Sequence, residues 1–207
     1  PAPPSRMSTR SRKGHFLDIV RGLDKAVMDP SSPLHVFAYG SLIWRPGFPF
    51  VAREAALLRG FHRRFCLWSR LYRGTPERPG LVLGLDRGGS CQGVVFTVAP
   101  EHAPATRAYL RERENPRGED VYHERLLPVR LASGATLRAL CYVADRRHPA
   151  YARPCAETTA RVIAAGRGEA GTNRDYLLNT LATLRDFGLR DRALEGIAAR
   201  LDGRAIH

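Results

Sequence analysis

A short apolar strand that stops at a Gly-Ser pair constrains the fold of this chain more than any other feature. Residues 36–39, Val-Phe-Ala-Tyr, have the apolar and aromatic bias of a buried strand. Gly40 can adopt a positive φ and Ser41 tolerates a tight turn, so we expect a sharp bend here. Such a bend directs successive backbone N–H groups into one concavity that can hold a carboxylate or an oxyanion. The stiff loop at residues 44–49 could wall that concavity; the alternative is a strand, a turn and a surface loop without a ligand.

Extended segments follow this bend. Residues 51–69 alternate apolar side chains with Arg and His, as in a strand with one wet face, and the Gly- and Pro-rich residues 70–80 indicate an ordered loop. Two hairpins are predicted after that loop. The first joins residues 81–85 to 91–98 through a turn at 86–90, and the second joins residues 122–131 to 135–144.

Helical spacing of apolar residues marks the remaining segments. It predicts helices over residues 16–28 and 100–114, and a helical pattern from residue 156 onwards. Asn173 and Asp191 are expected to cap the last two helices. The sum is an α+β fold, in which a small, partly closed antiparallel β-barrel has helices packed on its outside.

The length of 207 residues suits one domain that buries roughly 70% of its unfolded surface. We expect a flexible basic tail at residues 1–14 and a single domain over residues 15–207. No apolar run approaches the roughly 20 residues of a membrane span, and the polar first residues do not match a secretory signal. The four cysteines form no Cys-x-x-Cys pair, which argues against a zinc site. A cytoplasmic protein without a membrane partner is the expectation.

The formal net charge of +13 raises the alternative of a nucleic-acid-binding module built on a basic β-barrel. Lys13 and Lys25 are the only lysines, so nearly all of the positive charge is arginine. The arginines are spread through every segment instead of forming one stripe, whereas nucleic-acid binders concentrate their charge on one face. We therefore expect no nucleic-acid partner.

Two features of the sequence could carry chemistry, and neither is a phosphate loop, a dinucleotide fingerprint or a His-x-x-x-His motif. One is the bend. The other is the acidic end of the helix at residues 100–114, where Glu112 shares a helix face with Tyr109 and Glu114 shares one with Leu110. An alternating charge run of this kind is often a solvated helix face, so spacing alone does not choose between the two glutamates.

Longer motifs give the chain a family resemblance. The runs VFAYGSLIWRPGFPF and RGFHRRFCLWSRLYRGTPERPGLVLGLDRGGSCQGVVFTV are followed in order by YLRERE, LCYVAD and a GxxGTNRDYLLNTL stretch at residues 168–181. Together they resemble the ChaC-type γ-glutamylcyclotransferases, the glutathione-specific branch of that superfamily. The resemblance spans residues 36–188 and leaves the first 35 residues outside.

The resemblance implies cleavage of glutathione into 5-oxoproline and cysteinylglycine, without water, metal or cofactor. The α-amine of the γ-glutamyl group attacks its own γ-carbonyl and closes a five-membered ring, so no protein nucleophile is needed. The protein would hold a folded-back conformer and move protons. One carboxylate can do the second task if burial raises its pKa from ~4.3 toward neutrality.

The family pattern also implies roles for individual residues. It selects Glu114, after Arg113, as the general base and acid, and Tyr122 as a substrate contact. Substrate would further contact the bend formed by Tyr39, Gly40, Ser41 and Leu42, mainly through its backbone N–H groups. The link at residues 115–121 is longer than the family's usual Gly-rich link, so Glu112 stays an alternative base. Other γ-glutamyl amines or amino acids stay open as substrates, as does a fold that has lost catalysis.

Overall fold

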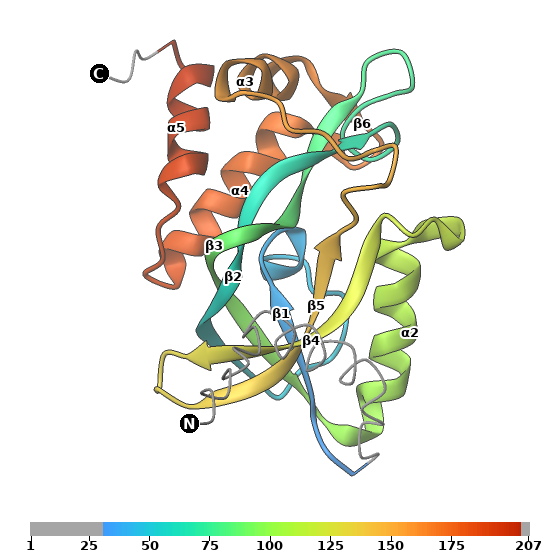
Figure 1. Cartoon of the computed structure of the whole chain (residues 1–207), viewed down its shortest axis with the longest axis vertical. Coiled ribbons are helices and arrows are strands. Elements are labelled where there is room, and N and C mark those ends of the chain that lie inside the picture. The colour runs from blue at the N-terminus through green and yellow to red at the C-terminus, as the bar shows by residue number, and fades with distance from the viewer. Residues whose placement is uncertain (1–30, 204–207) are drawn as a thin grey trace, which may run out of the picture.

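The computed structural model of the chain describes residues 31–203 (Figure 1). The expected tail at residues 1–14 and the expected helix at residues 16–28 lie outside this range. Within it, no helix is both long and apolar enough to cross a membrane.

A closed barrel of β-strands forms the centre of the structure, with the order β1-β3-β2-β4-β5. Neighbours in that order pair antiparallel, and short parallel contacts of β5 with β1 and β3 complete the closure. The predicted α+β fold, a small β-barrel with helices packed outside, is confirmed, and the barrel is closed where the sequence indicated partial closure. The strands are β1 (Leu34–Ala38), β2 (Ala52–Ser69), β3 (Gly80–Val98), β4 (Tyr122–Leu131) and β5 (Thr136–Ala144).

The hairpin predicted within residues 81–98 is wrong, because β3 is one continuous strand that pairs with β2 along its whole length. On β3, Arg87 pairs with Phe61 of β2 and Ser90 pairs with Arg59. Gly88 and Gly89, both at positive φ, lie between these two pairs. The register shifts here, opposite Gly60 on β2, which also has positive φ. The glycines thus absorb a bulge that bends both strands, and the chain does not reverse.

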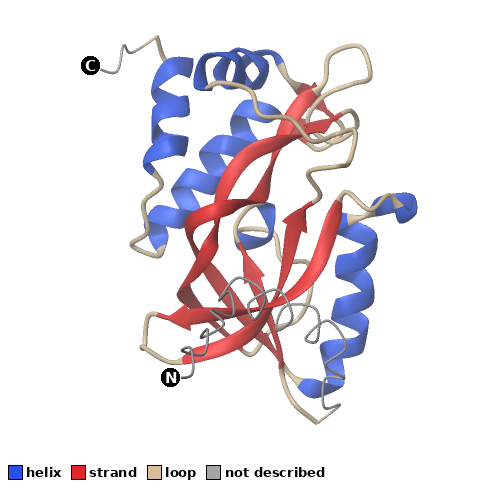
Figure 2. Cartoon of the chain, viewed as in Figure 1, coloured by secondary structure: helices blue, strands red, loops and turns tan. Residues whose placement is uncertain are grey.

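Helices cover the barrel from two sides (Figure 2). A 3-10 turn at Pro100–His102 leads into α2 (Ala103–Glu114), which lies along one side and buries Leu110 against the barrel. The other three helices gather on the opposite side from α2, beside the long hairpin of β2 and β3. These are α3 (Ala156–Ala165), α4 (Asn173–Asp186) and α5 (Arg192–Leu201).

The N-terminus of α4 is capped by Thr172, so the prediction of Asn173 as the cap is wrong. The Thr172 hydroxyl accepts the backbone N–H of Asp175 at 3.0 Å. Asn173 is fully buried, and its side-chain amide accepts from the backbone N–H of Leu81 and donates to the Leu81 carbonyl, each at 2.7 Å. This pair of bonds fastens α4 to β3, so the polar side chain serves tertiary structure instead of the helix end.

The predicted cap of α5 is confirmed, and it reaches the interior through Arg63. Asp191 accepts the backbone N–H of Leu194 with one carboxylate oxygen and Arg63 Nη1, at 2.6 Å, with the other. The buried Arg63 guanidinium also donates to the carbonyl oxygens of Gln92 and Tyr39. Because Tyr39 directly follows β1, this network holds the entry to the bend.

Candidate active site

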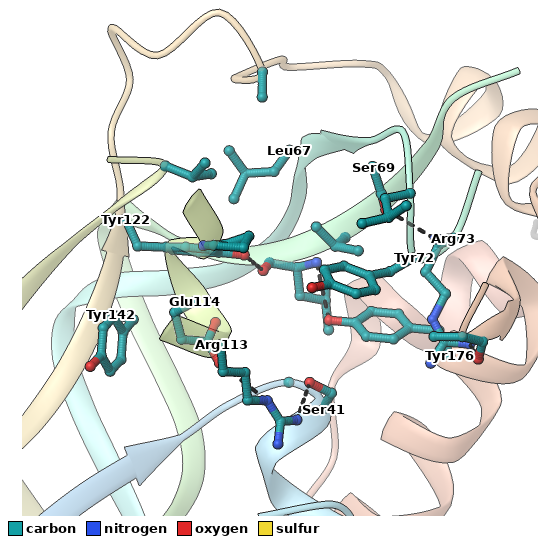
Figure 3. A pocket seen from close by; sticks show the side chains of 18 of the residues that line it. Ser41, Leu67, Ser69, Tyr72, Arg73, Arg113, Glu114, Tyr122, Tyr142 and Tyr176 are labelled. Carbon is teal, nitrogen blue, oxygen red and sulfur yellow. Dashed lines mark hydrogen bonds and ion pairs between the residues drawn. The ribbon is translucent and has the colours of Figure 1, made fainter. Parts of the chain in front are cut away.

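A cavity of about 1240 Å³ opens where the bend, the loop after β2, the end of α2 and the start of α4 meet (Figure 3). All of the residues that the sequence singled out for the site line this cavity except Glu112. They are Tyr39, Gly40, Ser41, Leu42, Glu114 and Tyr122. The structure therefore brings together segments that lie far apart in the chain.

The bend is a 3-10 turn at Ser41–Ile43 with Gly40 as its N-cap. The backbone N–H of Ile43 donates to the Gly40 carbonyl at 3.0 Å, and that of Arg45 donates to the Ser41 carbonyl at 2.9 Å. The first N–H groups of such a turn have no acceptor within it. At the cavity wall, those of Ser41 and Leu42 are therefore suited to bind an anionic oxygen.

Gly40 does not adopt the expected positive φ; its φ is −130°. The reason for glycine at this position is close approach. A Cβ built there would lie 3.1 Å from Tyr176 Oη and 3.7 Å from Leu83 Cβ, so any side chain would push into the packed wall of the cavity.

Arg113 ties the end of α2 to the bend. Its Nη2 donates to Ser41 Oγ at 3.0 Å (Figure 3). Its Nη1 donates to the Arg45 carbonyl at 2.7 Å. Nη1 also donates to the hydroxyl of Tyr109 at 2.8 Å. These bonds fix the position of the next residue, Glu114, relative to the bend.

Glu114 is the last residue of α2, and its side chain is 15% exposed. Burial raises the pKa of this carboxyl to about 7, and the positive charge of Arg113, whose Nε lies 3.7 Å from Glu114 Oε1, opposes the shift. A carboxyl with a pKa near neutrality can take up and return a proton under physiological conditions.

Glu112 lies on a different face of the same helix. It is exposed and is not part of the cavity wall, whereas Glu114 follows the fully buried Leu110 by four residues. Residues four apart on a helix share a face, so the packing of Leu110 turns Glu114 toward the interior.

The link at residues 115–121 delivers Tyr122 to the cavity. The Asn115 side chain donates to the Tyr122 carbonyl at 2.9 Å and accepts its N–H at 2.8 Å, so both ends of the link are joined. The Tyr122 hydroxyl reaches across the barrel and donates to the Leu83 carbonyl at 2.9 Å. The added length is therefore accommodated without displacing Tyr122 from the wall.

The family model of ChaC-like proteins matches residues 34–203. The chain belongs to the ChaC-like family. It is 34% identical over 166 residues to the glutathione-specific gamma-glutamylcyclotransferase of Escherichia coli (strain K12), covering 80% of this chain and 71% of that protein. It is 37% identical over 153 residues to glutathione-specific gamma-glutamylcyclotransferase 1 of Homo sapiens, covering 72% and 68%.

Solved structures give the same fold for this ChaC-like protein. The crystal structure of a glutathione-specific gamma-glutamyl cyclotransferase from yeast matches with a TM-score of 0.76 at 26% identity, covering 85% of this chain and 99% of that one. A further gamma-glutamyl cyclotransferase, at 16% identity, matches with a TM-score of 0.54 and shows the fold alone.

Three further residues line the cavity of this ChaC-like protein without having been predicted as site residues from the sequence: Arg73, Tyr142 and Tyr176. The Tyr39 hydroxyl donates to the backbone carbonyl of Tyr142 at 2.9 Å. The Arg73 guanidinium lies over the Tyr176 ring, 5.1 Å from its centroid. All three occur within the motifs that carry the family resemblance, which was the available signal. Spacing alone indicated a loop for Arg73, a strand for Tyr142 and a helix for Tyr176.

Proposed function

We propose that this chain is a glutathione-specific γ-glutamylcyclotransferase, a lyase that converts glutathione to 5-oxoproline and cysteinylglycine. One observation carries the proposal: Glu114, whose pKa is raised to about 7 by burial, shares a cavity with the free N–H groups of the bend. The names of the Escherichia coli and human relatives support glutathione as the substrate.

The reaction balances without a protein nucleophile. The α-nitrogen forms a bond to the γ-carbon, and the amide bond from that carbon to the cysteinyl nitrogen breaks. Both protons that the α-ammonium loses end on the departing nitrogen. Glu114 is suited to accept a proton from the α-ammonium and to return it to the departing nitrogen. With a pKa of about 7, its carboxyl can exist in either protonation state near neutral pH.

The remaining wall would hold the substrate in its folded-back conformer. Backbone N–H groups of Ser41 and Leu42 would bind an anionic oxygen of the γ-glutamyl group, and Tyr39 and Tyr122 would enclose the group between β1 and β4. Holding the amine against its own carbonyl supplies a proximity effect that can lower the barrier by roughly 7–11 kcal/mol.

The purified protein is expected to convert glutathione into equal amounts of 5-oxoproline and cysteinylglycine, measured by mass spectrometry. Glutathione acetylated at the α-nitrogen should be inert, because it has no free amine to close the ring. A matched γ-glutamyl amino acid should react far more slowly than glutathione. Release of free glutamate would identify a hydrolase and contradict the proposal, and equal turnover of both substrates would contradict glutathione specificity.

A further inference from the structure

Burial raises the pKa values of four tyrosines around Glu114, and the charge of Glu114 adds to each shift. The four differ in the acceptors of their hydroxyl protons. They are Tyr39, Tyr122, Tyr142 and Tyr176. A tyrosine hydroxyl has one proton to donate, so a hydroxyl that donates to the protein can meet a substrate only as an acceptor.

Three of these protons have acceptors in the protein. Tyr39 donates to the carbonyl of Tyr142 at 2.9 Å, and Tyr122 donates to the carbonyl of Leu83 at 2.9 Å. The Tyr142 hydroxyl lies 3.4 Å from Glu124 Oε2 and donates to it.

Tyr176 is different, because its hydroxyl is an acceptor in the structure. The backbone N–H of Leu83 donates to Tyr176 Oη at 3.3 Å, and no acceptor for the Tyr176 proton is found among residues 31–203. The backbone of Leu83 therefore binds the two hydroxyls in opposite senses: its carbonyl accepts from Tyr122, and its N–H donates to Tyr176.

The hydroxyl of Tyr176 lies at the bend. A Cβ at Gly40 would lie 3.1 Å from Tyr176 Oη, so the hydroxyl lies directly beside the backbone of the bend. The ring is fixed by edge contacts with Trp44 and Phe65, whose centroids lie 5.5 and 5.9 Å away, and by Arg73 over its face. A donor fixed before substrate binds does not need to reorganise during the reaction.

We propose that Tyr176 is a further catalytic residue, whose hydroxyl donates a hydrogen bond to the γ-carbonyl oxygen of the γ-glutamyl group as negative charge develops there. Ring closure converts that carbonyl into a tetrahedral centre with a charged oxygen, which hydrogen-bond donors fixed beside it stabilise. Burial raises the pKa of Tyr176 to about 12, so the hydroxyl keeps its proton throughout the working range of Glu114. The inference rests on the proposed function.

Tyr176→Phe tests this role because it keeps the ring and removes the hydroxyl. We expect kcat for 5-oxoproline formation to fall by about 10²-fold or more, as for loss of one oxyanion donor, with KM changed less than threefold. The matched control is Tyr151→Phe, which removes a hydroxyl that donates to Asp86 at 2.9 Å outside the cavity wall, and it should keep wild-type kcat.

A second measurement separates catalysis from structure, since Tyr176→Phe also deprives the Leu83 N–H of its acceptor. Glutathione binding is measured by calorimetry to Glu114→Gln and to the double variant Glu114→Gln/Tyr176→Phe. Equal dissociation constants are expected, because the bond forms in the transition state. Weaker binding by tenfold or more, or a kcat of Tyr176→Phe within threefold of wild type, would overturn the inference. Absence of 5-oxoproline with the wild-type protein would instead overturn the proposed function.

Discussion

Glu114→Gln is expected to lower kcat for 5-oxoproline formation by about 10²–10⁴-fold while glutathione still binds. Glutamine has nearly the same shape and can still form hydrogen bonds, but it cannot take the proton from the α-ammonium. Steady-state kinetics gives kcat, and calorimetry with the inactive variant gives the dissociation constant. A loss confined to KM would contradict the assignment of Glu114 as the base.

The matched control for this variant is Glu112→Gln, two residues earlier on α2. Glu112 is exposed and lies outside the cavity wall, so kcat should change less than about threefold. The reverse pattern, an inactive Glu112→Gln beside an active Glu114→Gln, would show that the wrong carboxylate was chosen.

The stability of Glu114→Gln gives an independent check that the variant is folded. The folded-state pKa of Glu114 is raised to about 7, so the folded state binds more protons than the unfolded state between ~4.3 and about 7. The contribution of Glu114 to the free energy of unfolding therefore decreases as the pH rises through this window. At pH 8 the variant should melt at a higher temperature than the wild-type protein, because it buries no charged carboxylate.

Gly40→Val is expected to lower kcat/KM by at least about 10²-fold, the effect of misplacing a binding group by roughly 1 Å. The first side-chain carbon already meets Tyr176 Oη at 3.1 Å and Leu83 Cβ at 3.7 Å, and the two methyl groups of valine need further space. Either the bend or Tyr176 must move, and either movement would disrupt the proposed anion-binding wall. Initial rates over a range of glutathione concentrations measure the effect.

Ser41→Ala is the milder comparison at the same bend, because the proposed contact uses the backbone N–H. The hydroxyl accepts from Arg113 at 3.0 Å, and its loss should cost less than about tenfold in kcat/KM. Activity of Gly40→Val within a few-fold of wild type, in a protein with an unchanged melting temperature, would show that the bend does not hold the substrate.

Much of the barrel could be predicted from the sequence because apolar alternation follows burial along each strand. The bounds of β2, β4 and α2 differ from the predicted bounds by at most three residues. The error at residues 86–90 has a physical cause: Gly-Gly is compatible with a tight turn and with a bulge. The choice depends on the distant Gly60, which local sequence does not reveal.

The polar residues of the core were harder to predict, since their partners are remote in the chain. Asn173 fits the pattern of a helix cap, yet its amide bonds to Leu81 on β3. Tyr176 fits the apolar face of α4, and its role at the cavity emerges only when Gly40 and Leu83 are placed beside it. Long-range contacts decided both cases.

The candidate base could be selected only through family resemblance. The run Arg-Glu-Arg-Glu offers two similar carboxylates, and helical spacing places each on a face that could be wet or buried. The structure distinguishes their surroundings, because Leu110 packs into the barrel and Glu114 shares its face. The role of Glu114 in catalysis stays a prediction that kinetics must test.

The pH dependence of kcat/KM for glutathione tests the central assignment most directly. With a Glu114 pKa of about 7, the rate should fall on the acid side of an apparent pKa near 7, approaching tenfold per pH unit. The α-amine and thiol of glutathione titrate above this value, so they do not account for a decrease in rate on the acid side. The same decrease should persist in His148→Gln, which removes the histidine that lines the cavity. If Glu114 is the base, this acid-side decrease in rate disappears from the residual activity of Glu114→Gln. A wild-type profile flat down to about pH 5, or a decrease that survives in Glu114→Gln, would contradict the assignment.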